Sequence, residues 1–196
     1  MISLVAVGKV LWVSLVIGWY LLRRPFDRRA RKARLTVDRR KGADTIRLAI
    51  SLAGLGIIPA VYVVTSLPRF ASYPANPVLF ALGVVSGIAA LILFRLTHKA
   101  LGKMWSVSLQ LKQDHKLITT GIYKHLRHPM YTAFWLMALT QALLLPNYIA
   151  GLAGLVCFGY LFFSRVGPEE EMMQEAFGEE YSRYRARTWR VLPYVY

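Results

Sequence analysis

The chain has 196 residues, of which 56% are hydrophobic, and a formal net charge of +15 at pH 7. This length suits one domain, and the mean hydropathy of +0.39 indicates a membrane protein and argues against an ordinary soluble domain. A charge of this size is common in nucleic-acid-binding proteins, but its distribution along the chain favours a membrane surface instead.

Five apolar stretches follow one another along the chain. They cover residues 2–22, 48–67, 78–94, 130–145 and 147–163. As one helix the last two would be about 51 Å long, against roughly 30 Å of hydrocarbon in a bilayer. Because Pro146 and Asn147 supply a turn between them, we expect two short antiparallel helices. The sequence therefore predicts an all-α, polytopic membrane bundle of five transmembrane helices, forming a single domain over residues 1–196 with a C-terminal cytosolic segment at 164–196.

The Lys and Arg residues are concentrated on one side of such a bundle. Of the 25, 23 lie in residues 23–47, 95–127 and 165–190. Positively charged loops mark the cytosolic side, so we expect the N-terminus outside and the C-terminus in the cytosol. The basic segment after the first span is also expected to contact anionic membrane lipids. We expect neither nucleic acid nor an obligate protein partner.

Two features within the spans predict how the helices pack and bend. Gly83 and Gly87 form a GxxxG pattern, which lets membrane helices approach closely. Pro59 predicts a kink in the second span.

The longest informative polar stretch is GIYKHLRHPMY at residues 121–131. Pro129 suits the first turn of a helix, so His128-Pro129 is expected to begin the fourth span. Tyr131 then lies three residues on, on the same face as His128, and the free N–H groups of the helix start offer a place for a carboxylate. The residues alone leave two interpretations open, a functional site or two side chains that anchor the span at the membrane interface.

His125 and His128 are three residues apart, a spacing that is also found in metal sites. Pro129 makes the helix begin between or after them, so the two histidines need not share a face. A third ligand with convincing spacing is missing from the sequence. We therefore expect no metal.

Three consecutive acids, Glu169, Glu170 and Glu171, follow the fifth span. A solvated charge run is their ordinary interpretation. Near a lipid–water boundary, however, a carboxylate is also a suitable partner for an ammonium group. Arg165 lies four residues before Glu169, so a plain salt bridge within the helix competes with any functional role.

Taken together, these segments resemble the isoprenylcysteine carboxyl methyltransferase family of integral membrane enzymes. The resemblance rests on HKLITTGIYKHLRHPMY (115–131), the acidic run after two further spans, FGEEYSRY (177–184) and the terminal Leu192-Pro193. It covers roughly residues 98–196. It implies a cytosolic pocket for S-adenosylmethionine, with S-adenosylhomocysteine as product, closed by the C-terminal helix.

The resemblance also implies roles for individual residues. Glu169, with Glu170 beside it, would receive the methionine ammonium group, and Arg165 and Arg127 would position the substrate carboxylate. The remaining cofactor contacts would come from His115, Lys116, Leu117, Ile118, Gly121, Tyr123, His128, Pro129, Met130 and Tyr131.

The expected reaction is methylation of the carboxylate of an isoprenylcysteine-like or other lipophilic substrate that enters from the bilayer. A short chain of this kind is expected in the prokaryotic cell membrane. The acceptor stays open, because phospholipid amines, small thiols and phenolic lipids are also chemically possible. A different class is a non-catalytic membrane adaptor whose basic loops bind lipid. The sequence does not decide the oligomeric state or which of Glu169 and Glu170 contacts the cofactor.

Overall fold

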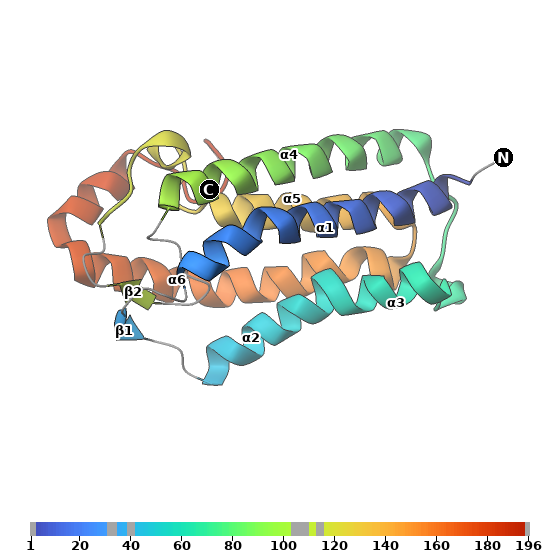
Figure 1. Cartoon of the computed structure of the whole chain (residues 1–196), viewed down its shortest axis with the longest axis horizontal. Coiled ribbons are helices and arrows are strands. Elements are labelled where there is room, and N and C mark those ends of the chain that lie inside the picture. Colours follow the sequence, from blue (N-terminus) through green and yellow to red (C-terminus); the bar gives the residue numbers. More distant parts are fainter. Residues whose placement is uncertain (1–2, 31–34, 39–41, 103–109, 113–115, 195–196) are drawn as a thin grey trace.

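The computed structural model describes residues 3–30, 35–38, 42–102, 110–112 and 116–194 and contains a bundle of helices that run side by side (Figure 1). The helices are α1 (Leu4–Ala30), α2 (Gly42–Leu52), α3 (Ile58–Thr65), α4 (Pro77–Leu101), α5 (Pro129–Leu144) and α6 (Tyr148–Ala186). Two short strands, β1 (Leu35–Asp38) and β2 (Gln110–Lys112), pair antiparallel beside one end of the bundle. The predicted all-α bundle is confirmed, with this small ribbon as an addition.

Four of the described helical segments are long and apolar enough to cross a membrane. They are Leu4–Arg28, Gly42–Thr65, Pro77–Leu101 and Tyr148–Ala186. The second of these is continuous because a π-helix, Ala53–Ile57, joins α2 to α3, and Pro59 follows in the first turn of α3. Helix α5 has 16 residues and is about 24 Å long. That is the length expected for one leg of the predicted hairpin.

The turn between α5 and α6 is built around Asn147. Its side-chain oxygen accepts hydrogen bonds from the backbone N–H groups of Ile149 and Ala150 and so caps α6. Its amide donates to the Pro68 carbonyl at 2.9 Å and to Ser72 Oγ at 3.0 Å. The turn expected from Pro146-Asn147 is therefore also the anchor of the connection between α3 and α4.

Small residues set the distances between helices, as the GxxxG pattern predicts. A Cβ atom on Gly83 would lie 2.9 Å from Leu144 Cδ2, and one on Gly87 would lie 3.1 Å from Thr140 Cγ2. Helix α4 can therefore lie close against α5. Ser86, between the two glycines, donates a hydrogen bond of 3.0 Å to the Leu136 carbonyl of α5.

A buried amide connects the second span to the α5–α6 hairpin. Gln141 is 1% exposed, and its Nε2 donates to the Gly54 carbonyl at 3.0 Å and to the Ala150 carbonyl at 2.7 Å. Gly54 lies in the π-helix, whose altered hydrogen-bond pattern gives its carbonyl to this side chain. The same glycine lets α6 approach, because a Cβ atom there would lie 2.4 Å from Cys157 Cβ.

Helix α6 extends well beyond the bundle and then turns back. Its 39 residues correspond to about 58 Å, so the part after Phe163 continues past roughly 30 Å of hydrocarbon. At Gly178 the backbone leaves helical geometry (φ 50°, ψ −124°), and the second arm reverses direction, at the left of Figure 1. The sequence predicts the helical continuation but not this bend, which returns the C-terminus to the start of α5.

Candidate functional site

The site lies where the C-terminal segment meets the loop before α5. The 3₁₀-helix at Gly121–Lys124 leads into this loop, where Leu126 forms a parallel bridge with Trp189. The Arg127 N–H donates to the Trp189 carbonyl at 2.7 Å, and the His128 N–H donates to the Arg190 carbonyl at 2.9 Å. The returning chain is thus fixed by backbone hydrogen bonds to the residues that open α5.

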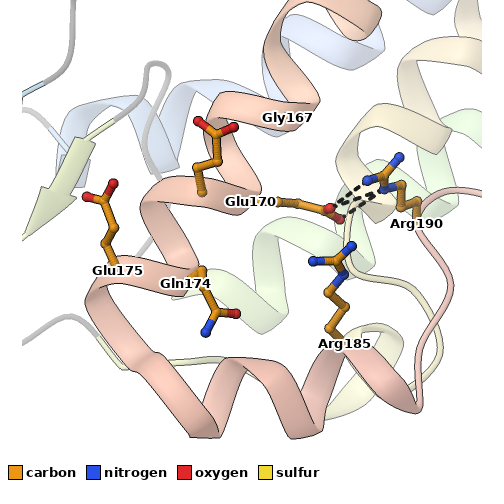
Figure 2. A pocket seen from close by; sticks show the side chains of 7 residues that line it. Gly167, Glu170, Gln174, Glu175, Arg185 and Arg190 are labelled. Carbon is orange, nitrogen blue, oxygen red and sulfur yellow. Dashed lines mark hydrogen bonds and ion pairs between the residues drawn. The ribbon is translucent and has the colours of Figure 1, made fainter.

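Glu170 is the centre of a buried charge cluster at this junction. Its residue exposure is 5%. Arg127 Nε donates to Oε1 at 2.9 Å, Arg190 Nη2 donates to Oε2 at 2.8 Å, and His128 Nε2 lies 3.3 Å from Oε1. Figure 2 shows the paired side chains of Glu170 and Arg190. Burial alone raises the pKa of Glu170, but its contacts with His128, Arg190 and Arg127 outweigh burial and lower that pKa, so Glu170 is ionised.

Arg127 also fastens the end of α6. Its Nη1 donates to the Arg185 carbonyl at 3.2 Å and, through a second short contact, to the Thr188 carbonyl. The guanidinium therefore connects the RHP segment to both Glu170 and the returning backbone.

Glu169 has different surroundings from its neighbour. Tyr131 Oη donates to its Oε2 at 2.5 Å, and His128 Nδ1 lies 3.7 Å from its Oε1. About 30% of the Glu169 side chain is exposed, against 6% for Glu170. Burial raises the pKa of Glu169, but its contacts with His128, Arg165 and Tyr131 outweigh this and lower it to about 2. Glu169 is therefore ionised, and its side chain is less enclosed than that of Glu170.

His128 lies between these two acids. Burial alone lowers its pKa, but contacts with Glu169 and Glu170 outweigh burial and raise the pKa above its ordinary value. The imidazole stacks on the Tyr131 ring, with centroids 5.5 Å apart, so the two side chains share a face as predicted. Tyr131 in turn packs against Phe162, with centroids 5.3 Å apart. The site therefore rests directly on the aromatic core of the bundle.

Arg165 is buried on the adjoining turn of α6, and it has a partner that the sequence does not suggest. Its Nε lies 3.5 Å from Asp44 Oδ1, in the first turn of α2. The Glu169 carboxylate contacts Tyr131 and His128 within 4 Å. Arg165 is not among its ion-pair partners in the part of the chain that the structure describes. The salt bridge between Arg165 and Glu169 that their spacing suggests is replaced by an ion pair with another helix.

The other predicted cofactor contacts are distributed along the segment before α5. Tyr123 is buried, and its backbone carbonyl accepts a 2.8 Å hydrogen bond from Tyr184 Oη. The backbone of Gly121 has φ 62°, a conformation that favours glycine. Lys116 is exposed and Leu117 and Ile118 are half-buried. His115 lies outside the described residues.

A pocket of about 370 Å³ opens between the two arms of α6, on the side of Glu170 that faces Arg185 and Arg190 (Figure 2). Its lining residues are Gly167, Glu170, Glu171, Gln174, Glu175, Arg185 and Arg190.

Sequence reasoning missed Asp44, Thr188 and Arg190. Asp44 had one usable signal, because an acid in the first turn of an apolar span is costly unless it is paired. For Arg190 and Thr188 the sequence contains no such signal, because their contacts depend on the bend at Gly178.

Comparison with known proteins shows which family the chain resembles. Residues 81–175 match the model of the isoprenylcysteine carboxyl methyltransferase (ICMT) family. The chain resembles this family over these residues, which make up just under half of its length. The match includes the segment at 115–131 and the acids at 169–171, whereas the returning C-terminal segment around Arg190 lies outside it.

Several curated ICMT relatives resemble the chain over part of their length. A protein-S-isoprenylcysteine O-methyltransferase of Schizosaccharomyces pombe is 33% identical over 45% of this chain and 38% of that protein. Enzyme B of Arabidopsis thaliana is 30% identical over 45% of each chain, and the Homo sapiens enzyme is 32% identical over 41% of this chain and 28% of its own. The matched segments thus span less than half of these relatives.

A solved structure extends the likeness to most of the fold. The structure of the eukaryotic intramembrane Ras methyltransferase ICMT matches with a TM-score of 0.52 and 22% identity, covering 81% of this chain and 55% of that one. Together with the apolar helices, this makes the chain an integral, multi-pass membrane protein whose fold resembles that of ICMT.

Proposed function

We propose that this chain is an S-adenosylmethionine-dependent carboxyl O-methyltransferase that acts on an isoprenylcysteine-like or other lipophilic carboxylate within the membrane. The observation that carries the proposal is the state of Glu169, which is ionised, partly exposed and held by Tyr131 and His128. The match of residues 81–175 to the ICMT family model supports the reaction class.

The described residues fit the charged amino-acid end of S-adenosylmethionine. An ammonium group binds well to a carboxylate that is ionised and partly withdrawn from water. Glu169 meets both conditions, while Glu170 is already occupied by two arginines and His128. We therefore assign the ammonium contact to Glu169 and the closure of the C-terminal segment to Glu170. When bound, S-adenosylmethionine supplies an electrophilic methyl group, and S-adenosylhomocysteine remains afterwards.

The proposed pocket is completed by the segment before α5 and the first turn of that helix. Its further members are His115, Lys116, Leu117, Ile118, Gly121, Tyr123, His128, Pro129, Met130 and Tyr131. Aromatic burial around Tyr123 and Tyr131 would exclude water from the cofactor, which strengthens every charged contact within the site.

A carboxylate acceptor suits a site of this kind. A carboxyl group is already ionised at neutral pH, so the chain needs no general base. It needs a cation that orients the acceptor anion and a geometry that aligns the two reactants. We assign this role to Arg165, which lies one turn before Glu169 on α6, and assign Arg127 to the closure of the C-terminal segment, since its Nε and Nη1 contact Glu170 and backbone carbonyls.

We further propose that the cofactor enters from the cytosol and the isoprenoid tail enters from the bilayer between helices. This requires the site to face the cytosol, with the N-terminus outside and the C-terminus inside, as the positive-inside rule predicts. Reporter fusions at residue 35 and after Tyr196 should report the cytosol, and a fusion near Tyr73 should report the outside. A cytosolic signal from the fusion near Tyr73 would contradict this orientation.

Cofactor binding tests the proposed function. The purified protein in detergent should bind S-adenosylmethionine and S-adenosylhomocysteine with one-to-one stoichiometry in isothermal titration calorimetry. A folded sample that shows neither heat nor a thermal shift at millimolar cofactor would refute the enzyme proposal and favour a membrane adaptor.

A further inference from the structure

Asp44 is a buried acid with no role in the function proposed above. It lies in the first turn of α2, at the mouth of the second span, and is 2% exposed. Neither of its carboxylate oxygens takes a hydrogen bond within the described part of the chain. Among the residues that the structure describes, the ion pair with Arg165 Nε at 3.5 Å is therefore the contact that compensates the buried charge of Asp44.

The position of the Arg165 guanidinium matters because Glu169 is nearby. The two residues are four apart on α6, a spacing at which Arg and Glu ordinarily pair. The positive charge of Arg165 acts on the Glu169 carboxylate, since it contributes to lowering the pKa of Glu169. An arginine that turned towards Glu169 would neutralise the carboxylate that we assign to the cofactor ammonium.

We propose that Asp44 is a positioning residue that holds Arg165 on the α2 side of the site and so keeps Glu169 available to a cation. The inference rests on the proposed function, because it assumes that Glu169 binds the cofactor. It adds a contribution from the second span, outside the part of the chain that matches the family model.

The test is a set of affinities for S-adenosylhomocysteine, measured by calorimetry in detergent. Asp44→Asn should weaken binding about tenfold or more, as expected when a desolvated charge-assisted contact is lost. Asp44→Glu, which keeps the charge, should bind within about threefold of the wild type. Adding Arg165→Met to Asp44→Asn should restore binding to near the wild-type affinity, because the competing cation is then gone. In an Asp44→Asn sample that is folded by circular dichroism, a merely structural role of Asp44 would leave the affinity unchanged, so neither the tenfold loss nor its restoration would be observed.

The double variant also covers the case in which Asp44→Asn alone fails to fold, since it leaves neither charge buried without its partner. A folded double variant that binds S-adenosylhomocysteine more than tenfold more weakly than the wild type would overturn the inference. Equal affinities of the wild type and a folded Asp44→Asn variant would overturn it as well. Absence of binding by the wild type itself would instead refute the proposed function, so the two failures are distinguishable.

Discussion

Glu170 and Arg190 lie 20 residues apart on the two sides of the bend in α6, and their side chains pair at 2.8 Å. The pair closes the C-terminal segment over the start of α5, together with Arg127. The two neighbouring acids therefore differ, because Glu170 fixes the fold while the side chain of Glu169 is less enclosed.

The first prediction concerns this closure. Glu170→Gln should lower the stability of the detergent-solubilised protein by about 3 kcal/mol, because it leaves Arg127 and Arg190 without their shared anion. Glu171→Gln, at an exposed neighbouring position, is the matched control and should change stability little. Thermal unfolding checks the result, and equal melting temperatures of the two variants would contradict the assigned role.

A second prediction concerns the bend itself. Gly178→Ala should destabilise the protein by roughly 1–3 kcal/mol, because φ 50° with ψ −124° is strained for any residue with a Cβ atom. A Cβ atom there would meet nothing within 4 Å, so the effect would come from the backbone alone. Gly167→Ala, on the same helix with the same open surroundings, should be neutral or stabilising. Equal effects at both positions would argue against a required bend.

The third prediction is a pH dependence. His128 has a raised pKa in the folded protein, so its charged form is stabilised by Glu169 and Glu170. That contribution is fully present below the unfolded pKa of about 6.5 and is lost as pH rises through the folded pKa. The stability difference between the wild type and His128→Gln should therefore be larger at pH 6 than at pH 9. A difference that stays constant or grows with pH would contradict the assignment.

The bundle could be predicted because its causes are local. The lengths of the apolar stretches, compared with the thickness of a bilayer, predict the spans. Pro146-Asn147 predicts the hairpin turn between α5 and α6, and the GxxxG glycines predict the close contact between α4 and α5. Pro129 marked the start of α5, and the spacing of His128 and Tyr131 gave their shared face. Each of these follows from helix geometry over a few residues.

The charge network could not be predicted in the same way. The Arg190–Glu170 and Asp44–Arg165 pairs join distant segments, and no periodicity relates them. The bend at Gly178 was also hidden, because an isolated glycine in a helical pattern is usually tolerated. Local spacing instead favoured an Arg165–Glu169 pair, and the tertiary contact with Asp44 prevailed.

A fourth prediction separates the glutamates by function. Glu169→Gln should weaken S-adenosylhomocysteine binding on the order of 10- to 100-fold, since a partly desolvated charge-assisted contact contributes about 1.5–3 kcal/mol. Glu179→Gln and Glu180→Gln, at exposed positions on the second arm, should bind like the wild type. Calorimetry on the three variants decides this, and indistinguishable affinities would reject the role of Glu169.

The most direct test of the central claim is methyl transfer from labelled S-adenosylmethionine to a prenylcysteine analogue, with a phospholipid amine as the competing acceptor. We expect transfer to the prenylcysteine carboxylate. In samples shown to be folded, because Arg165→Ala also leaves Asp44 without its partner, this substitution should nearly abolish transfer while leaving cofactor affinity largely intact. Arg165→Lys should rescue it poorly because only arginine holds a carboxylate in bidentate geometry. Transfer to the amine alone, with little effect of Arg165→Ala, would contradict the carboxylate assignment.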